Sequence, residues 1–461
     1  MREGLHKIVS DDGTIVAVST PLGHSGIGIV RLSGAQSRDI AVRCFKASSG
    51  NSDLQHRTAV VGVWNAVNGE QIDEVVITFF AAPHSYTGED VLEISAHGNP
   101  FLLRRIVESA QAAGARPAGP GEFTLRAVAH GKMDLVQAEA VKEFIECQTE
   151  HQAKNALRQM SGTISRRIRP IKEELLNLIA HLEAGIDFAE DDVDVPANAF
   201  IAEHIRPLVL QLEPLKDSFG YGRMLSKGLR LAILGKPNVG KSSLFNRLVG
   251  ADRAIVADIP GTTRDVVTET VSLDGVPLCF ADTAGIRNTT DEVEGMGVER
   301  TFETLAEADF ALAVLDGSQP MDEDDEETLR RACEIPHVIV INKNDLPQQN
   351  AYQLNGSKRV RLSAKTGQGF EELYAALGEF LLSHRRSMAD DFVLTSARQY
   401  DAVANAAAAL GNAEQATLAG TPHEMVLLDL YRGLGALDEL TGDVVTEDIL
   451  QRIFSTFCIG K

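Results

Sequence analysis

A glycine-rich loop is the part of this sequence whose residue types and spacing most clearly predict chemistry. Residues Gly235–Ser242 are Gly-Lys-Pro-Asn-Val-Gly-Lys-Ser. The two glycines let the backbone curl until its N–H groups converge on a polyphosphate, and the start of a following helix adds partial positive charge. Lys241 can reach the β- and γ-phosphates, while the Ser242 hydroxyl can bind Mg²⁺. The loop therefore predicts binding of a nucleoside triphosphate, although short glycine patterns also occur in ordinary turns.

A second motif predicts which base is bound. Asn342-Lys343-Asn344-Asp345 follows the apolar run His337–Ile341. The two carboxylate oxygens of Asp345 match the two adjacent N–H donors on the guanine edge, a pair that adenine lacks. Charge-assisted hydrogen bonds contribute about 1.5–3 kcal/mol each, so a mismatch lowers the affinity by orders of magnitude. We expect Asn342 and Lys343 to hold the loop and cover the base, and the motif favours GTP over ATP.

Two further motifs complete the expected nucleotide site. Asp282–Gly285 offers a carboxylate that can hold Mg²⁺ through water and a glycine that can turn a backbone N–H toward the γ-phosphate, and Ser363–Lys365 follows another strand-like run. In this order after a phosphate-binding loop, the motifs resemble those of the translation-factor-related GTPases over roughly residues 229–380. The residues that we expect to contact GTP are Asn238, Val239, Gly240, Lys241, Ser242, Ser243, Ala257, Asp258, Ile259, Pro260, Gly261, Thr262, Thr263, Asp282, Thr283, Ala284, Gly285, Asn342, Lys343, Asp345, Ser363, Ala364 and Lys365.

The hydrolytic machinery differs from that of many GTPases. Ile286 follows Asp282–Gly285, at a position where a glutamine often orients the attacking water. An isoleucine cannot orient water, and the charge that an arginine finger supplies elsewhere is worth about 10³–10⁵ in rate. Another group must therefore position the water and stabilise the developing charge. Asn238 lies inside the glycine-rich loop beside the phosphates, and Thr263 is the expected switch threonine whose hydroxyl reaches Mg²⁺.

Four stretches outside the nucleotide site carry a more specific resemblance. They are Ser85–Glu93, Pro120–Ala127, Lys132–Ala140 and the carboxyl-terminal Arg452–Lys461. Together with Gly-Thr-Thr-Arg-Asp at 261–265, they closely resemble the MnmE (TrmE) family, whose members are GTPases of tRNA wobble-uridine modification. The resemblance covers essentially the whole chain.

The resemblance implies how hydrolysis is completed. In that family the loop asparagine and carbonyl oxygens of the first switch loop bind K⁺, which takes the place of an arginine finger. The K⁺ ligands implied here are Asn238, Ala257, Ile259 and Thr262, and the Mg²⁺ ligands are Ser242 and Thr263. The water-orienting glutamate of the family matches Glu294, which its own surroundings would make a solvated acid on an acidic loop. Lys241 and Thr263 complete the expected catalytic set.

The amino-terminal domain of this family binds a formyl-tetrahydrofolate and dimerises, and the resemblance implies the same here. A pterin needs a carboxylate for its N–H edge, and the glutamate tail of a folate needs cations. The implied folate contacts are Arg31, Glu93, Lys132 and Lys461, and Glu89 remains an alternative to Glu93.

The resemblance also implies partners and a reaction. Cys458 is implied in the modification chemistry, and its alternative is a free, buried thiol; Gly460 and the terminal lysine make a poor prenylation box. The implied assembly is a homodimer that forms a heterotetramer with the FAD- and NADH-using protein MnmG (GidA). Together they would add a (carboxymethyl)aminomethyl group to C5 of the tRNA wobble uridine, with one carbon from tetrahydrofolate. A regulatory GTPase switch in ribosome assembly, without covalent chemistry, is the alternative, because it would carry the same nucleotide motifs.

Composition limits the other possibilities. The 461 residues include 65 acidic and 44 basic side chains, a net charge of −21 that disfavours nucleic-acid binding in general. Lys154–Lys172 is an exception, with six cations and no acid, although a solvated helix face is the simpler explanation. No apolar run is long enough for a membrane span, and the amino terminus has no signal-peptide core. Five scattered cysteines favour the reducing cytoplasm.

Three domains are expected to position these residues. Residues 1–131 contain β-rich runs separated by turns and one helical run, which predicts a separate α+β domain. The resemblance implies that this domain binds the folate and dimerises. Residues 132–226 and 385–461 have helical periodicity and would form one discontinuous helical domain. Residues 227–384 alternate strands and helices, which predicts an inserted P-loop GTPase domain with a doubly wound, mainly parallel sheet. The expected fold class is thus multidomain α/β plus α.

Overall fold

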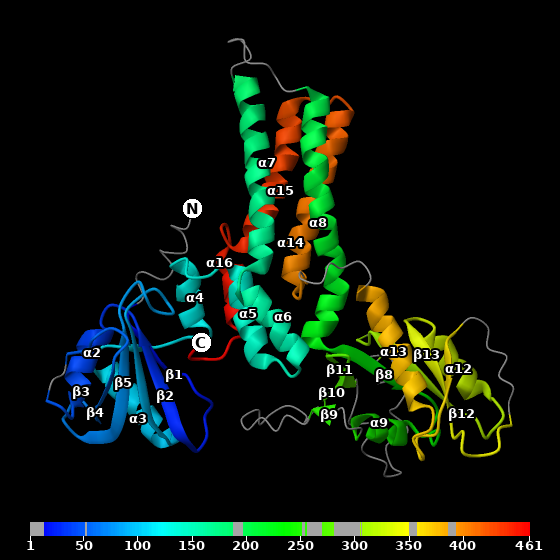
Figure 1. The fold of residues 1–461 in the computed structure, drawn as a ribbon, viewed down its shortest axis with the longest axis horizontal. Coiled ribbons are helices and arrows are strands. Elements are labelled where there is room, and N and C mark those ends of the chain that lie inside the picture. Colours follow the sequence, from blue (N-terminus) through cyan, green and yellow to red (C-terminus); the bar gives the residue numbers. More distant parts are fainter. Residues whose placement is uncertain are drawn as a thin grey trace.

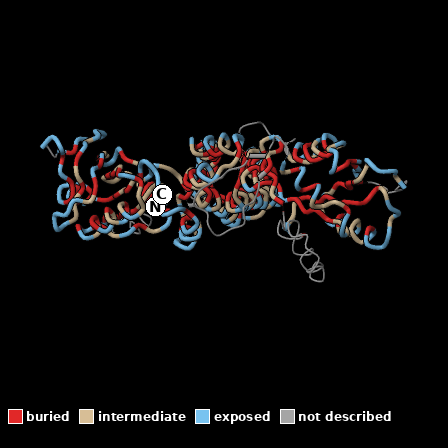
Figure 2. Tube along the Cα trace, turned by 90° about the horizontal axis from the view of Figure 1, so that it is seen from below, coloured by how far each residue is buried: buried red, intermediate tan, exposed pale blue. Residues whose placement is uncertain are grey.

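The computed structural model describes residues 13–50, 53–187, 197–250, 254–255, 270–280, 305, 307–349, 357–385 and 393–461. Figure 1 shows three bodies: a sheet built from the first strands, an upright bundle of long helices in the middle, and a second sheet beyond it. Figure 2 shows that buried residues lie inside each of these bodies. The multidomain α/β plus α class that the sequence predicts is confirmed.

The amino-terminal body is a seven-stranded sheet against which two helices pack. Its strand order is β3-β4-β5-β6-β2-β1-β7, and every neighbouring pair is antiparallel except β1 and β7. Strand β5 alternates as a half-buried strand should, since Val75, Ile77 and Phe79 are buried while Glu74 and Val76 are exposed. The buried face packs on α2 and α3. These elements are β1 (Ile15–Val18), β2 (Ser25–Ser33), α2 (Ser37–Cys44), β3 (Phe45–Ala47), β4 (Ala59–Asn65), β5 (Gln71–Phe80), β6 (Val91–Gly98), α3 (Pro100–Ala112) and β7 (Arg116–Pro117).

The middle body is a helical bundle assembled from two separate parts of the chain. Helices α7 and α8 come before the second sheet in sequence, whereas α14 and α15 come after it, and their buried leucines, isoleucines and alanines share one core. Side-chain caps start two of the shorter helices, because Asp134 and Thr149 each form a capping box. Within the described ranges, no helix is long and apolar enough to cross a membrane. Helix α4 (Glu122–Ala129) packs on β1 of the first sheet through Phe123. The helices of the bundle are α5 (Leu135–Glu146), α6 (Glu150–Met160), α7 (Thr163–Asp187), α8 (Asn198–Lys227), α14 (Ala397–Leu418), α15 (His423–Thr441) and α16 (Glu447–Phe454).

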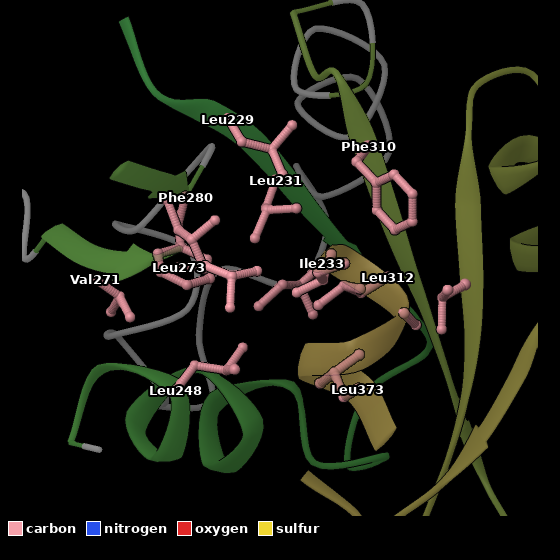
Figure 3. Close-up of a cluster of buried hydrophobic side chains, with 14 of the residues drawn as sticks. Leu229, Leu231, Ile233, Leu248, Val271, Leu273, Phe280, Phe310, Leu312 and Leu373 are labelled. Carbon is pink, nitrogen blue, oxygen red and sulfur yellow. The ribbon is translucent and has the colours of Figure 1, made fainter. Parts of the chain in front are cut away.

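The second sheet is mainly parallel and has helices on both faces. Its order is β14-β13-β12-β8-β11-β10-β9, and the five strands from β14 to β11 are parallel. Strand β8 supplies both cores: Leu229, Leu231 and Ile233 face a large cluster with α9 and α13, shown in Figure 3, while Ala232 and Leu234 face α12. The elements are β8 (Leu229–Leu234), α9 (Lys241–Val249), β9 (Ala254–Ile255), β10 (Thr270–Leu273), β11 (Val276–Phe280), β12 (Phe310–Asp316), α12 (Glu323–Ala332), β13 (His337–Asn342), β14 (Arg359–Arg361) and α13 (Phe370–Arg385).

The chain crosses between the bundle and the second sheet twice, and both crossings are bonded to α6. On the outward crossing, Nε2 of Gln152 donates a hydrogen bond to the carbonyl oxygen of Ser226 at 2.8 Å. On the return crossing, Nε2 of the buried Gln159 donates to the carbonyl oxygen of Val393 at 2.8 Å. One short helix therefore holds both connections.

A separate apolar cluster joins the amino-terminal body to the bundle. Val128 of α4, Leu135 of α5, Leu450 and Phe454 of α16, and Phe457 beyond it pack together. The carboxyl-terminal segment is thus held between the two bodies, so its last residues reach the first sheet.

Candidate nucleotide-binding site

The glycine-rich loop connects β8 to α9 and has the backbone that a phosphate cradle needs. Gly235, Asn238 and Gly240 have φ angles of 151°, 63° and 99°, so the chain turns through the left-handed region three times within six residues. A Cβ atom on Gly240 would lie 2.3 Å from Nδ2 of Asn342. Glycine is therefore required at position 240 both by the backbone angle and by the close approach of the neighbouring loop.

The lysine of this loop lies across it. Nζ of Lys241 donates hydrogen bonds to the carbonyl oxygens of Gly235 at 2.6 Å and Lys236 at 2.9 Å. These bonds place the ammonium group beside the curled backbone, where it can stabilise the negative charge of a polyphosphate. Ser242 and Ser243 follow in the first turn of α9, so their N–H groups lie at the positive end of the helix dipole.

A buried amide ties this loop to the two base-recognition loops. Asn342 ends β13 and is 2% exposed. Its Nδ2 donates to the carbonyl oxygen of Val239 at 2.7 Å, and its Oδ1 accepts from the backbone N–H of Ala364 at 2.9 Å. The structure thus brings together three motifs that are far apart in sequence, and it gives Asn342 the role of holding the loop.

The carboxylate expected to recognise guanine is oriented by a serine. Oγ of the fully buried Ser363 donates to Oδ1 of Asp345 at 2.6 Å and itself accepts from the backbone N–H of Thr366 at 3.1 Å. The Ser363 bond lowers the pKa of Asp345, and the positive charges of Lys365 and Lys343 act in the same direction. Asp345 is therefore a carboxylate at neutral pH, the state that accepts two N–H donors.

Asp316 is a site residue that the sequence reasoning missed. Lys343 has a positive φ of 63°, and its Nζ donates to Oδ2 of Asp316 at 2.6 Å. Asp316 ends β12, is 4% exposed and also accepts from the N–H and hydroxyl of Ser318. Burial by itself would raise the pKa of Asp316, but the bonds from Lys343 and Ser318 lower it. The signal was present, because a polar residue at the carboxyl end of a buried parallel strand typically faces the ligand edge of the sheet.

Lys236, inside the glycine-rich loop, is a second residue that the prediction left out. Its Nζ contacts Oδ2 of Asp322 at 2.6 Å and Oδ2 of the buried Asp325 at 2.8 Å, both at the start of α12. Burial would lower the pKa of Lys236, whereas the two carboxylates raise it, and their effect is larger. The ammonium therefore stays charged and anchors the loop to α12.

Several expected residues lie outside the described ranges. They include the switch threonine, most of the implied K⁺ ligands and the implied water-orienting glutamate. Of the metal ligands, Asn238 and Ser242 are described, and both belong to the glycine-rich loop. The predicted residues outside the description are Ala257, Asp258, Ile259, Pro260, Gly261, Thr262, Thr263, Asp282, Thr283, Ala284, Gly285 and Glu294.

A second candidate site forms where the carboxyl-terminal residues meet the first sheet. Arg31 of β2 pairs with Glu93 of β6 at 2.8 Å, and its Nη1 donates to the carbonyl oxygen of Gly460 at 3.4 Å. The guanidinium carbon lies 5.9 Å and 5.8 Å from the ring centroids of Tyr86 and Phe123. Phe123 is fully buried, so the groups that a flat, polar heterocycle could meet are Arg31, Glu93 and the partly exposed Tyr86.

The last residues are held by backbone contacts. The backbone N–H of Phe123 donates to the carbonyl oxygen of Lys461 at 3.2 Å, and Oγ of Ser19 donates to that of Gly460 at 3.1 Å. Gly460 has a φ of 95°, and a Cβ there would lie 2.2 Å from the carbonyl oxygen of Val18. Burial lowers the pKa of Lys461, and the positive charge of Arg31 lowers it further. Arg31, Glu93 and Lys461 are therefore gathered in one place.

The other residues considered for this site have contacts or exposure that differ from those of Arg31, Glu93 and Lys461. Nζ of Lys132 donates to the carbonyl oxygen of Pro83 at 2.9 Å, and no contact with Arg31, Glu93 or Lys461 is seen among the described residues. Both oxygens of Glu89, the alternative to Glu93, accept from the buried Arg126, at 3.1 and 2.9 Å. The carboxylate of Glu89 is therefore occupied by its ion pair with a buried arginine. Cys458 is exposed, unlike the buried thiol that was its alternative.

Replacement of Asn342 by alanine should weaken guanine-nucleotide binding by about ten- to hundredfold. The change leaves the buried Val239 carbonyl and Ala364 N–H without their partner, which costs about 1–3 kcal/mol and loosens both loops. Fluorescence titration with a labelled GDP measures the affinity, and circular dichroism checks the fold. Asn344→Ala, on the same loop, is the matched control. Equal affinities in the two variants would contradict the role of the Asn342 amide.

Comparison with known proteins adds to this geometry. Residues 14–132 match the family model described as the GTP-binding protein TrmE N-terminus, and residues 135–458 match that of the MnmE helical domain. Proteins named tRNA modification GTPase MnmE are 48% identical over 98% of this chain and 99% of their own in Koribacter versatilis, and 42% identical over 97% and 99% in Aquifex aeolicus. The solved G domain of the T. maritima FeoB iron transporter, at 24% identity, covers 33% of this chain and 98% of its own with a TM-score of 0.24, too low to add to the assignment. The chain therefore belongs to the MnmE (TrmE) family of tRNA modification GTPases.

Proposed function

We propose that this chain is a cytoplasmic enzyme that hydrolyses GTP as part of tRNA modification. The observation that carries the proposal is the bonding of Asn342 to Val239 and Ala364, which joins the phosphate loop to the loops of Asp345 and Ser363. A site that reads both a polyphosphate and the guanine edge needs this junction. The relatives named tRNA modification GTPase support the RNA substrate, because they align with the chain from end to end.

In this proposal, each described residue of the site has one task. Lys241 stabilises charge on the β- and γ-phosphates, and Ser242 supplies a hydroxyl ligand for Mg²⁺. Asp345, oriented by Ser363, accepts the guanine N–H donors. Lys343, held by Asp316, covers the base. Ser242, together with Thr263, would hold Mg²⁺, whose positive charge would offset that of the phosphates.

We further propose that K⁺ stimulates hydrolysis, with Asn238 as its described ligand and Ala257, Ile259 and Thr262 as the others. An amide oxygen is a suitable ligand for a hard monovalent cation. Asn238 has a positive φ of 63°, so its backbone conformation is one that asparagine adopts far more readily than most residues. Thr263 would bind Mg²⁺, and Glu294 would orient the attacking water.

The site at the carboxyl terminus is proposed to bind a formyl-tetrahydrofolate. The carboxylate of Glu93 would accept from the pterin, while Arg31 and Lys461 would attract the glutamate tail. The partly exposed ring of Tyr86 beside Arg31 supports the proposal, since a pterin is flat and stacks. Lys132 remains part of the proposal, although its described contact is with Pro83.

The reaction proposed for the assembly is the addition of a (carboxymethyl)aminomethyl group to C5 of the wobble uridine. A homodimer of this chain would act with two copies of MnmG (GidA), which would bring FAD and NADH, and the folate would supply one carbon. The thiol of Cys458 is exposed and close in sequence to residues that contact the first sheet. Its exposure supports a part for this thiol in the proposed chemistry.

Deletion of the gene tests the function directly. We expect the deletion strain to lose the modification of wobble uridines, and the intact gene to restore it, as measured by mass spectrometry of digested tRNA. A variant with Lys241→Ala should fail to restore it, because the phosphates lose their lysine. Wobble uridines that remain modified in the deletion strain would leave only a regulatory GTPase, such as one acting in ribosome assembly.

Hydrolysis should depend on the monovalent cation. We expect GTP turnover to be at least about tenfold faster in K⁺ than in Na⁺ at the same ionic strength. The charge of the bound K⁺ would replace an arginine finger, which in other GTPases raises the rate by about 10³–10⁵. Asn238→Ala should abolish the difference, whereas Asn344→Ala should keep it. Phosphate release measured in the two salts provides the comparison, and equal rates in the parent chain would eliminate the K⁺ mechanism.

Replacement of Glu93 by glutamine should weaken folate binding by roughly ten- to hundredfold, since a charge-assisted hydrogen bond contributes about 1.5–3 kcal/mol. Calorimetric titration with a formyl-tetrahydrofolate measures the affinity. Glu70→Gln is the control, because Glu70 also pairs with an arginine, Arg105, but at a different place on the same body. If both variants bind the folate as the parent does, the assignment of Glu93 is wrong.

A further inference from the structure

One feature of the bundle has no part in either site. Helix α6 and the first turns of α7 carry an exposed group of cations in a chain whose net charge is −21. Lys172, which the sequence groups with them, instead has a side chain that is 14% exposed and pairs with Asp438 and Asp443. The exposed group, called the basic corner below, consists of Lys154, Arg158, Arg166, Arg167 and Arg169.

The basic corner stands on a fixed backbone. The hydroxyls of Ser161 and Thr163 donate to the carbonyl oxygen of Arg158 at 2.6 and 2.7 Å, which closes the turn between α6 and α7. From α5, Nε2 of Gln137 donates to the carbonyl oxygen of Met160 at 2.7 Å. Arginines on two braced helices present their charges at set positions, so a partner does not have to order this backbone when it binds.

Three of the five cations have partners that a phosphate can replace. Lys154 pairs with Glu150 at 2.5 Å and Arg169 with Glu173 at 3.8 Å, and all four of these side chains are more than half exposed. Such surface pairs contribute about 0–1 kcal/mol, so a phosphate can replace the carboxylate at small cost. Arg166 donates to the carbonyl oxygen of Ser161 and to the hydroxyl of Thr163, and both of these acceptors are neutral.

The place of the corner in the fold suggests a large partner. Figure 1 shows α5 and α6 at the lower end of the bundle, between the sheet that meets the carboxyl terminus and the sheet of the nucleotide site. Helix α5 packs on α4 and α16 on one side. At the other side, Oγ1 of Thr149, which caps α6, donates to the carbonyl oxygen of Gly275 at 2.7 Å. A long polyanion on this surface would therefore lie close to both sites.

We propose that the basic corner binds the phosphate backbone of the tRNA. The inference rests on the proposed function and adds the surface by which the RNA is held. Four of its five cations are arginines, whose guanidinium groups match phosphate oxygens in a two-pronged geometry. A strongly acidic chain repels RNA elsewhere, so RNA must approach through a local positive surface. Such contacts position the RNA without reading its sequence.

The salt dependence of tRNA binding tests the proposal on the full chain. We compare the parent with Arg158→Gln/Arg166→Gln/Arg167→Gln and with Arg167→Gln/Arg169→Gln, which leaves the turn untouched. The control is Arg206→Gln/Arg432→Gln, two exposed arginines of α8 and α15 that pair with Glu414 and Asp429. Fluorescence anisotropy with a labelled tRNA is followed from 50 to 200 mM KCl.

We expect the triple variant to lower the slope of log K against log[salt] by about 2.1–2.7, since each phosphate contact contributes roughly 0.7–0.9, and the double variant by about two thirds as much, roughly 1.4–1.8. The affinity at low salt should fall at least about tenfold in the triple variant, with GTP hydrolysis in the absence of RNA unchanged. Slopes equal to that of the control, or no tRNA binding by the parent chain, would overturn the proposal.

The parent gene and the corner variants are also introduced into the deletion strain, and the modification of wobble uridines is measured. This experiment distinguishes failure of the basic-corner proposal from failure of the proposed function. If the parent gene restores nothing, the proposed function fails, whereas the binding slopes still judge the corner. If the parent restores modification and the corner variants bind tRNA like the parent, the corner alone is refuted. Normal tRNA binding with lost modification would identify an acidic protein as the partner of this surface, which also refutes the RNA assignment.

Discussion

The nucleotide site depends on the two hydrogen bonds of a single buried amide. Asn342 bonds to Val239 and Ala364, which are 103 and 22 positions away in sequence. Each bond satisfies a backbone group that would otherwise be buried without a partner, at a cost of about 1–3 kcal/mol. Gly240 leaves the space that the Asn342 amide occupies, so the glycine-rich loop needs a glycine there because of a side chain from another loop. Asn342 is therefore better understood as a structural junction than as a contact to the base.

Two further cations of the site, Lys343 and Lys236, are each positioned by carboxylates from a neighbouring strand or helix. Lys343 is held by Asp316 at the end of β12, and Lys236 by two aspartates at the start of α12. The carboxyl ends of the parallel strands β8, β12 and β13 meet at one edge of the sheet, so loops that are distant in sequence become neighbours. These ion pairs hold the loops of Lys343 and Lys236 in place around the phosphate cradle.

Much of this organisation could be predicted from sequence, and the reasons for the exceptions are physical. The glycine-rich loop and Asp345 are recognisable because their chemistry is local: a few residues make the cradle or match the guanine edge. Asp316 was missed because its role arises only when β12 lies beside β13. Nothing local distinguished Glu93 from Glu89 either, since the difference is that Glu89 is bonded to the buried Arg126. In the same way, Lys172 appeared to be one of a run of exposed cations until the packing of α15 placed Asp438 beside it.

The contacts between the three bodies connect the nucleotide-binding site to the site at the carboxyl terminus. Helix α6 is bonded to both crossings of the chain, through Gln152 and Gln159, and to the second sheet through Thr149. Helix α5 precedes α6 directly and packs against α4 and α16. Helix α16 leads to the carboxyl-terminal residues. Apolar packing adds to these polar contacts, because Tyr221, Met224 and Leu225 of α8 are buried in the core of the second sheet. Continuous packing and hydrogen bonding thus connect the nucleotide-binding body, through α6 and α5, to the segment that carries Gly460, whose carbonyl oxygen accepts from Arg31.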